Sequence, residues 1–242
     1  MSPLHKLPRP RRGGGSGGGG AARFTPSRPP PLRGRGDFRG DLIEMRICFI
    51  GDSFVQGTGD DACLGWVGRI CAVLRQKGHD LTSYNLGIRR DTSADIRQRW
   101  QREALLRLPR EHDGRLVFSF GANDCCLDDA GRGVRVPHGE SITNARDILT
   151  AAKAWLPTLM VGPLPVGDRD VDIRVAALSA AFAPVCASIG VPYLEVFRVA
   201  AASAAWVSEA AAGDGSHPNA GGYAIVSEAI ERWPAWQAWH GA

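Results

Sequence analysis

Three side chains in this 242-residue chain have the types and the order that nucleophilic catalysis requires. Ser53 follows a short apolar run, and a serine hydroxyl is a weak nucleophile unless a base removes its proton. His217 is the candidate base, because a histidine of ordinary pKa, about 6.5, can accept that proton near neutral pH. Asp214 lies shortly before it, so a turn through Gly215 and Ser216 can direct its carboxylate to the ring Nδ1–H. The sequence therefore predicts acyl transfer from a serine.

Two further residues could stabilise negative charge on a substrate oxygen. Gly87 ends a second apolar run, and without a side chain it can present its backbone N–H closely. Asn123 follows a third run and offers a side-chain amide. Hydrogen-bond donors held at the position of the developing oxyanion speed acyl transfer, so we expect Gly87 and Asn123 to contribute to an oxyanion hole.

Neighbouring polar residues are interpreted as structural. Asp52 and Asp124 are predicted to hydrogen-bond the backbone of their loops, as short acidic side chains often do. Cys125 and Cys126 are interpreted as inert buried thiols, with a lining role in the pocket as the alternative. The sequence contains no H-E-x-x-H or C-x-x-C spacing, so we expect a reaction that needs neither a metal nor a cofactor.

Short apolar runs alternate with longer amphipathic runs along the chain, which indicates an α/β fold around a parallel sheet. Strands are expected at residues 45–50, 81–87, 115–121, 157–165 and 191–197. Helices are expected at residues 64–77, 94–108 with Ser93 as the cap, 140–155, 171–190, 200–212 and 219–232, the last capped by Asn219. This order predicts five strands in a three-layer α/β/α sandwich.

The candidate catalytic residues follow the ends of these strands. In an open parallel sheet the loops at the carboxyl ends of the strands converge, while helices cover both faces. The segments at those ends read GDSF, NLGIRRDTS and GANDCC, and the last strand leads through a helix to DGSHPN. We therefore expect Ser53, Asn123, Asp214 and His217 to share one edge of the sheet.

The same residues resemble a known family. The ordered blocks are Gly51-Asp52-Ser53, Gly87, Gly121-Ala122-Asn123-Asp124 and Asp214-Gly215-Ser216-His217. In order and in strand context they are similar to the four blocks of the SGNH or GDSL-type esterases and lipases, over roughly residues 45–235. The resemblance implies a serine hydrolase that acts on acyl esters, a catalytic triad, and a flavodoxin-like strand order 2-1-3-4-5. It also implies that the N–H of Ser53 joins Gly87 and Asn123 in the oxyanion hole.

The chain departs from this family at two positions. Phe54 stands where the name-giving pattern has leucine, a hydrophobic exchange that should leave the chemistry intact. Arg90 stands where many relatives carry a second glycine. With Arg89 it adds positive charge beside the expected site, which slightly favours an acidic or phosphate-bearing substrate.

We predict cleavage of small carboxylic esters, since no extended apolar lid is evident in the sequence. The same triad also fits a carbohydrate O-acetyl esterase, a thioesterase or a lysophospholipase, because loop shape rather than the triad selects the leaving group. A non-catalytic flavodoxin-like module that binds a nucleotide or flavin is the alternative from another class, since fold alone does not fix function.

The first part of the chain differs from the rest in composition. Residues 1–44 hold 7 of the 16 prolines and 10 of the 30 glycines and carry a net charge of +6, against −2 for the remainder. We predict a disordered basic extension over residues 1–44 and one hydrolase domain over 45–242. The overall basicity belongs to the extension, so no nucleic-acid partner is expected for the domain.

The sequence predicts neither a secretory signal nor a membrane span. Glycine stands where a secretory signal needs an apolar run, and no apolar stretch of 18 residues was found, so neither export nor a membrane span is expected. The six cysteines form no C-x-x-C pair. Reduced thiols and a cytoplasmic location are the simplest interpretation.

Overall fold

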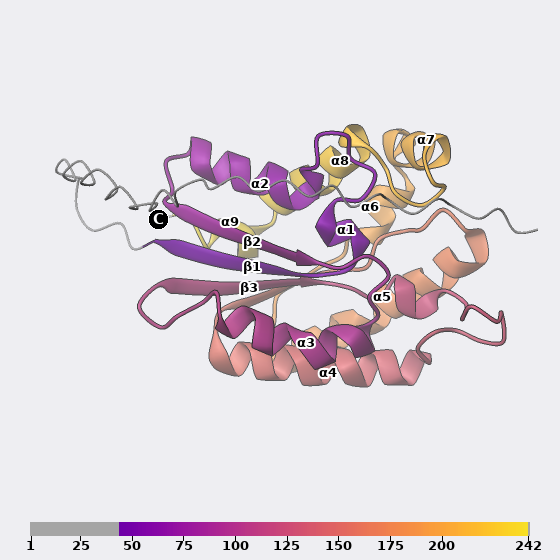
Figure 1. Ribbon diagram of the computed structural model, residues 1–242, viewed down its shortest axis with the longest axis horizontal. Coiled ribbons are helices and arrows are strands. Elements are labelled where there is room, and N and C mark those ends of the chain that lie inside the picture. The colour runs from indigo at the N-terminus through magenta and orange to yellow at the C-terminus, as the bar shows by residue number, and fades with distance from the viewer. Residues whose placement is uncertain (1–43, 242) are drawn as a thin grey trace, which may run out of the picture. The chain divides into compact units, whose positions relative to one another are not determined.

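The computed structural model describes residues 44–241, so the predicted extension lies outside the described residues except for its last position. Five parallel strands form one sheet in the order β2-β1-β3-β4-β5, which confirms the predicted topology (Figure 1). The strands are β1 (Met45–Gly51), β2 (Leu81–Gly87), β3 (Asp113–Ser119), β4 (Thr158–Val161) and β5 (Tyr193–Leu194).

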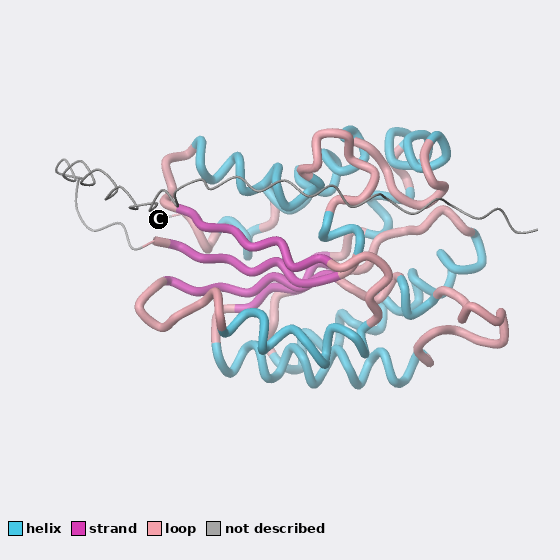
Figure 2. Tube along the Cα trace, viewed as in Figure 1, coloured by secondary structure: helices cyan, strands magenta, loops and turns pink. Residues whose placement is uncertain are grey.

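Helices follow each strand along the chain, and Figure 2 shows them in cyan on both sides of the magenta strands. They are α1 (Ser53–Gln56), α2 (Gly65–Gln76), α3 (Ser93–Leu105), the 3-10 helix η1 (Asn123–Cys125), α4 (His138–Trp155), α5 (Arg169–Ile189), α6 (Phe197–Ala201), α7 (Ala204–Ala212), α8 (Ala220–Glu231) and α9 (Pro234–Gln237). The short helices α1 and α9 were not predicted from the sequence.

Two helical layers enclose the sheet, which confirms the predicted sandwich (Figure 1). Aromatic residues of the strands join the layers. Phe49 of β1 packs edge-on against Trp66 of α2, with ring centroids 5.8 Å apart. Phe118 of β3 packs against Trp100 of α3 on the other face, at 5.4 Å. These four rings are almost fully buried, so the central strands are held from both sides.

From β1 the chain adds β2 on one side of the sheet and then β3, β4 and β5 on the other side. The point between β1 and β3 is therefore the topological switch point, where such sheets place their ligands. Gly51 at the end of β1 is in register with Gly87 of β2 on one side and with Ser119 of β3 on the other. The loops that follow these strands therefore begin at the same level, on the side of the sheet where Figure 1 shows α1.

The cap of α3 differs from the prediction by one residue. Thr92, not Ser93, is the N-cap: its backbone is extended, and its hydroxyl accepts the N–H of Asp95 at 3.3 Å. The Asp95 carboxylate in return accepts the Thr92 N–H at 2.9 Å. This reciprocal capping box satisfies two backbone N–H groups at the start of the helix, whereas a serine cap alone would satisfy one.

The two strands at the β5 edge of the sheet are shorter than predicted. Runs 157–165 and 191–197 contribute only four and two strand residues. Gly162 and Pro163 follow β4, and Pro192 precedes β5. Since proline has no N–H to donate to a neighbouring strand, the pairing stops at these residues.

Among the described helices, α5 is long and apolar enough to cross a membrane, with a mean hydropathy of 1.5 over 18 residues. The sequence prediction missed this because charged residues such as Asp172 and Arg174 interrupt the apolar run of the helix. Val175, Leu178 and Phe182 nevertheless lie fully buried in the core of the domain, so packing in the sandwich accounts for the apolar face of α5.

Candidate active site

The turn from β1 into α1 presents Ser53. Asp52 caps α1, with its carboxylate accepting the N–H of Phe54 at 3.0 Å, and Ser53 is the first residue of the helix. A Cβ atom at Gly51 would lie 2.0 Å from the carbonyl oxygen of Ser119, a separation that no side chain can adopt. The strand therefore ends in glycine because β3 passes too close for any other residue.

Ser53, His217 and Asp214 form a continuous hydrogen-bonded chain. The Oγ of Ser53 lies 2.7 Å from Nε2 of His217, and Nδ1 of His217 lies 2.7 Å from Oδ2 of Asp214. The other carboxylate oxygen of Asp214 accepts the backbone N–H groups of Ser216 at 3.0 Å and of His217 at 2.9 Å. The structure thus brings together the three residues that the sequence singled out, although they lie up to 164 positions apart.

The protonation states of Asp214 and His217 suit proton transfer from Ser53. Burial opposes ionisation of Asp214, but hydrogen bonds from the backbone and ring of His217 outweigh it and lower the pKa of Asp214 to about 2. Burial lowers the pKa of His217 below 6.5, against the opposing effect of Asp214. At neutral pH the aspartate is therefore ionised and the histidine is a neutral base.

Phe54 supports the base directly. Its ring packs on the imidazole of His217 with centroids 4.9 Å apart, and its other neighbour is Trp206 of α7 at 5.7 Å. The phenylalanine that departs from the family pattern therefore contributes to the burial of His217.

The loop that carries His217 is held by contacts that the sequence analysis did not predict. Asn219 caps α8 as predicted, and its side chain also accepts the N–H of Asp61 at 3.2 Å and donates to the Asp61 carboxylate at 2.7 Å. Glu209 of α7 accepts the N–H groups of Gly221 at 3.0 Å and Gly222 at 2.7 Å. These contacts fix the loop to α7 and to the segment after α1.

The structure corrects the predicted role of Gly87. Its N–H donates to the side-chain oxygen of Asn85 at 3.0 Å, so this donor is already engaged. A Cβ atom at Gly87 would lie 2.2 Å from the backbone nitrogen of Gln56. Glycine is therefore required there for close packing of β2 against α1, and the prediction that Gly87 donates to a substrate oxygen is not supported.

The next turn along the chain offers a different donor. Residues 88–91, here called the oxyanion turn, are closed by the N–H of Asp91 donating to the carbonyl of Ile88 at 3.2 Å. Arg90 occupies the third position with a φ of 72°, the left-handed region that usually holds glycine. Within residues 44–241 its N–H donates to no protein group.

Asn123 lies against this turn. One of its amide hydrogens is donated to the carbonyl oxygen of Asp91 at 3.1 Å, and the second hydrogen is left for another acceptor. The structure therefore places the predicted Asn123 donor against the turn that contains Arg90. The sequence analysis did not select this turn for the oxyanion, although arginine in place of the second glycine was a signal that could have indicated it.

Arg99 of α3 connects the nucleophile to the oxyanion turn, a role that was not predicted. Its guanidinium donates to the carbonyl of Gly51 at 2.9 Å and to the carboxylate of Asp91 at 2.6 Å. A planar guanidinium can hold two acceptors in fixed directions, so Arg99 sets the spacing between the end of β1 and the turn.

Two buried carboxyl groups lie beneath Ser53. Asp52 hydrogen-bonds the backbone of its own turn, as predicted, by accepting the N–H of Phe54. Asp124 also accepts a backbone N–H, but from Ser93 at the start of α3, at 2.7 Å, and not from its own loop. Burial, reinforced by the neighbouring charge of Asp124, raises the pKa of Asp52 from 3.8 to about 7. Burial also raises the pKa of Asp124.

We expect Asp52→Asn to stabilise the domain at alkaline pH. The folded chain keeps on Asp52 a proton that the unfolded chain loses above its ordinary pKa of 3.8. The stability that this proton provides is complete below about pH 4 and is lost as the pH rises through 7. Asparagine mimics the protonated carboxyl and still caps α1.

Urea unfolding of the wild type and D52N at pH 4 and pH 9 measures the effect. The variant should unfold at higher urea at pH 9, by a free energy on the order of 4 kcal/mol, with little difference at pH 4. A difference that does not change with pH would contradict a raised pKa at Asp52.

The structure contains a cleft beside the triad and a separate cavity beside η1. A polar cleft of about 490 Å³ runs beside His217 and Asp214, and its walls include Asp61, Arg89 and Asn219. A smaller apolar cavity of about 160 Å³ lies below η1.

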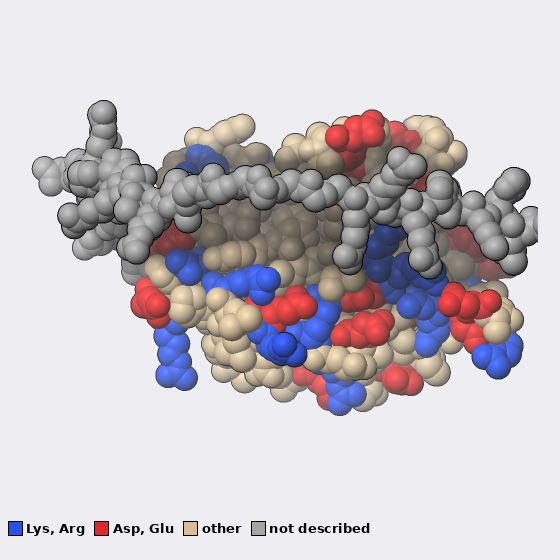
Figure 3. All heavy atoms as spheres, viewed as in Figure 1, with Lys and Arg blue, Asp and Glu red and all other residues tan. Residues whose placement is uncertain are grey.

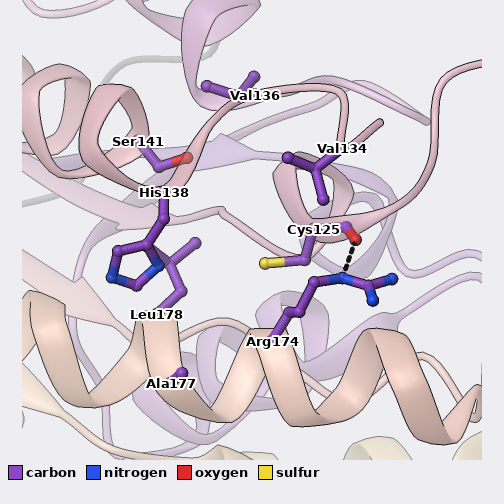
Figure 4. A pocket seen from close by; sticks show the side chains of 8 residues that line it. All are labelled: Cys125, Val134, Val136, His138, Ser141, Arg174, Ala177 and Leu178. Carbon is purple, nitrogen blue, oxygen red and sulfur yellow. Dashed lines mark hydrogen bonds between the residues drawn. The ribbon is translucent and has the colours of Figure 1, made fainter. Parts of the chain in front are cut away.

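Figure 4 shows the thiol of Cys125 directed into this apolar cavity, between His138 and Arg174. Burial raises the pKa of Cys125 to about 12. The thiol therefore both lines the cavity and stays protonated, as its interpretation as an inert buried group requires.

Comparison with known proteins relates this site to a family. Residues 49–225 match the sequence pattern of the GDSL-like lipase/acylhydrolase family. No curated protein sequence matches the chain.

Solved structures share the fold. An acetylxylan esterase from Geobacillus stearothermophilus is 17% identical, with a TM-score of 0.65 over 79% of this chain and 95% of that chain. A lipase/acylhydrolase from Enterococcus faecalis is 23% identical, with a TM-score of 0.60 over 78% of this chain and 94% of that chain. Since the family match spans most of the chain, the protein belongs to the GDSL-like lipase/acylhydrolase family and is an ester-hydrolysing enzyme.

Proposed function

We propose that this chain hydrolyses small carboxylic esters through an acyl-enzyme on Ser53. His217 Nε2 takes the proton of Ser53 as Oγ attacks the carbonyl carbon, and it then returns that proton to the departing alcohol. Water attacks the acyl-enzyme with His217 again taking a proton, and the proton goes to Ser53 Oγ as the acid leaves. Asp214 stays ionised and holds the imidazole. The proposal is carried by the two 2.7 Å contacts that join the three side chains.

The oxyanion in this scheme receives three donors. We assign them to the N–H of Ser53, the N–H of Arg90 and the side-chain amide of Asn123. The engaged N–H of Gly87 and the contact between Asn123 and the carbonyl of Asp91 support this assignment.

A carbohydrate acetyl ester is the second candidate substrate. The cleft beside His217 is lined by polar and charged groups, as the hydroxyl-rich alcohol of a sugar acetate would require. The structural relative named above is an acetylxylan esterase, and catalytic mutants of that enzyme replace an aspartate, a serine and a histidine with alanine. Those are the residue types of the site proposed here.

A panel of acetyl, butyryl and longer aryl esters, together with acetylated xylose oligomers, tests the proposal. We expect turnover of acetyl esters and a decline with acyl length. Release of acetate from the oligomers faster than from the aryl ester would assign the second candidate. Absence of hydrolysis across the panel would overturn the proposal.

We also propose that the protein is located in the cytoplasm. All six cysteines are free thiols, in residues that the structure describes. This supports the reduced, cytoplasmic location expected from the sequence. Fractionation of the native host would test it.

The pH dependence of kcat/KM should follow the ionisation of His217. The base acts only when neutral, so the rate should rise with pH and level off above a midpoint below 6.5, because burial lowers the pKa of His217. A profile that is flat between pH 5 and 8 would argue against a histidine base.

Arg89 offers a way to move this midpoint. Its guanidinium donates to Oδ2 of Asp214 at 3.0 Å, and its positive charge lowers the pKa of His217. Arg89→Gln should shift the midpoint upward. The ion pair is exposed, so solvent screens it and we expect a shift of only a few tenths of a pH unit, about what weak surface pairs give.

A further inference from the structure

We propose that Arg135 is a positioning residue that holds Arg90 in its left-handed conformation and thereby orients an oxyanion donor. This inference rests on the function proposed above and adds a residue that contacts neither the substrate nor the triad.

The oxyanion turn has an unfavourable residue at a critical position. Arg90 has a φ of 72°, where a residue with a Cβ is disfavoured relative to glycine. Because the N–H of Asp91 closes the turn, the N–H of Arg90 is left outside it. A change of φ at Arg90 would rotate this N–H away, so the direction of the donor depends on a conformation that arginine does not favour.

One loop supplies two contacts to Arg90. Residues 126–136, here called the hairpin loop, follow η1. Nη1 of Arg135 donates to the carbonyl oxygen of Arg90 at 2.8 Å. The side chain of Arg90 in turn donates to the carboxylate of Asp129 at 2.8 Å. Both contacts lie between exposed groups. Only the bond from Arg135 reaches the backbone of Arg90, so it is the one that acts directly on the conformation of this peptide.

The hairpin loop is itself anchored to the other side of the oxyanion hole. Leu127 and Val134 form an antiparallel bridge that closes the loop. The N–H of Arg135 donates to the carbonyl of Cys126 at 2.8 Å, and that of Val136 donates to the carbonyl of Asp124 at 3.1 Å. Asp124 directly follows Asn123 and Cys126 lies three residues after it, so Arg135 connects the segment that carries the Asn123 amide to the peptide of Arg90.

The charged groups near Arg135 make no ion pair with it within the described residues. On the face drawn in Figure 3, acidic and basic side chains lie intermixed, without a large field of one sign. The positive charge of Arg135 acts on the neighbouring carboxyl groups of Asp95 and Asp124. Its guanidinium nevertheless donates to the carbonyl of Arg90, so the proposal rests on this hydrogen bond.

The test combines Arg135→Ala with Arg90→Gly. In the wild-type background, R135A should lower kcat about tenfold, which corresponds to the usual cost of the left-handed conformation for a residue other than glycine. KM should change little, because the donor acts on the transition state. In the R90G background the same R135A change should lower kcat less than about twofold, since glycine adopts this conformation without help.

Arg132→Ala is the matched control, since Arg132 lies in the same loop and its exposed guanidinium pairs with Asp128. Thermal unfolding and circular dichroism report whether each variant folds. A loss of kcat that is equal in both backgrounds would show that R135A merely damages the fold and would overturn the proposal. Unchanged kcat in R135A would also overturn it while leaving the wild-type esterase activity, and hence the proposed function, intact. A wild type that hydrolyses no ester would overturn both.

Discussion

Replacing Ser53 with alanine should lower kcat for a short aryl acetate by at least about 10⁴-fold. The Oγ of Ser53 is the atom that attacks, and its contact with Nε2 of His217 at 2.7 Å provides the path for its proton. Without the hydroxyl, only the donors of the oxyanion hole and substrate binding remain. Initial rates measured with matched protein concentrations give the ratio.

The fold should survive this substitution, because alanine fits the space of serine at the first turn of α1 and Asp52 still caps the helix. Ser208→Ala is a suitable control, since the hydroxyl of Ser208 only contacts the carbonyl of Ala205 on α7. Residual activity of S53A within tenfold of the wild type would remove Ser53 from the mechanism.

Replacing Asn123 with alanine should lower kcat by about 10²- to 10³-fold with little change in KM. Its amide donates one hydrogen to the carbonyl of Asp91, which fixes the side chain, and the other is available to the oxyanion. Since this charge develops only in the transition state, the loss should fall on kcat.

Asn123→Asp sharpens this prediction. Aspartate has almost the same shape as asparagine but places a negative charge where the oxyanion forms. We expect N123D to be slower than N123A, because repulsion adds to the lost donor. Activity of N123A within threefold of the wild type would show that the oxyanion hole does not include Asn123.

The triad could be predicted from the sequence because its critical relations are local. Asp214 and His217 lie in one loop, where a short turn brings the carboxylate to the ring. Ser53 follows a buried strand directly, and parallel strands end at a common edge, so its partner loop could be named without coordinates. Only the packing of Phe54 on His217 had no sequence signal.

The oxyanion hole was harder to predict because it depends on which backbone donors are free. Gly87 has the right residue type, but the Asn85 side chain, two positions earlier on the same strand, takes its N–H. Arg90 has the wrong residue type for its backbone conformation, and contacts from a distant loop stabilise it there. Neither fact follows from residue type or spacing.

Contacts between distant segments were also out of reach of the sequence. The pair of Asp61 and Asn219 joins residues 158 positions apart, and Arg99 reaches Gly51 across 48 positions. A polar side chain on a helix has many possible partners, and pattern alone does not select one. The lengths of β4 and β5 were overestimated for a simpler reason. Prolines end the pairing of these strands, although the sequence runs that contain them are apolar.

The most direct test of the account is labelling with a fluorophosphonate, which reacts covalently with a serine only when a base activates its hydroxyl. Mass spectrometry of the digested protein would then identify the labelled peptide in the wild type and in His217→Ala. The account predicts a single label on Ser53 in the wild type and almost none in H217A at the same time and concentration. A label on another residue, or equal labelling of Ser53 in the two proteins, would contradict it.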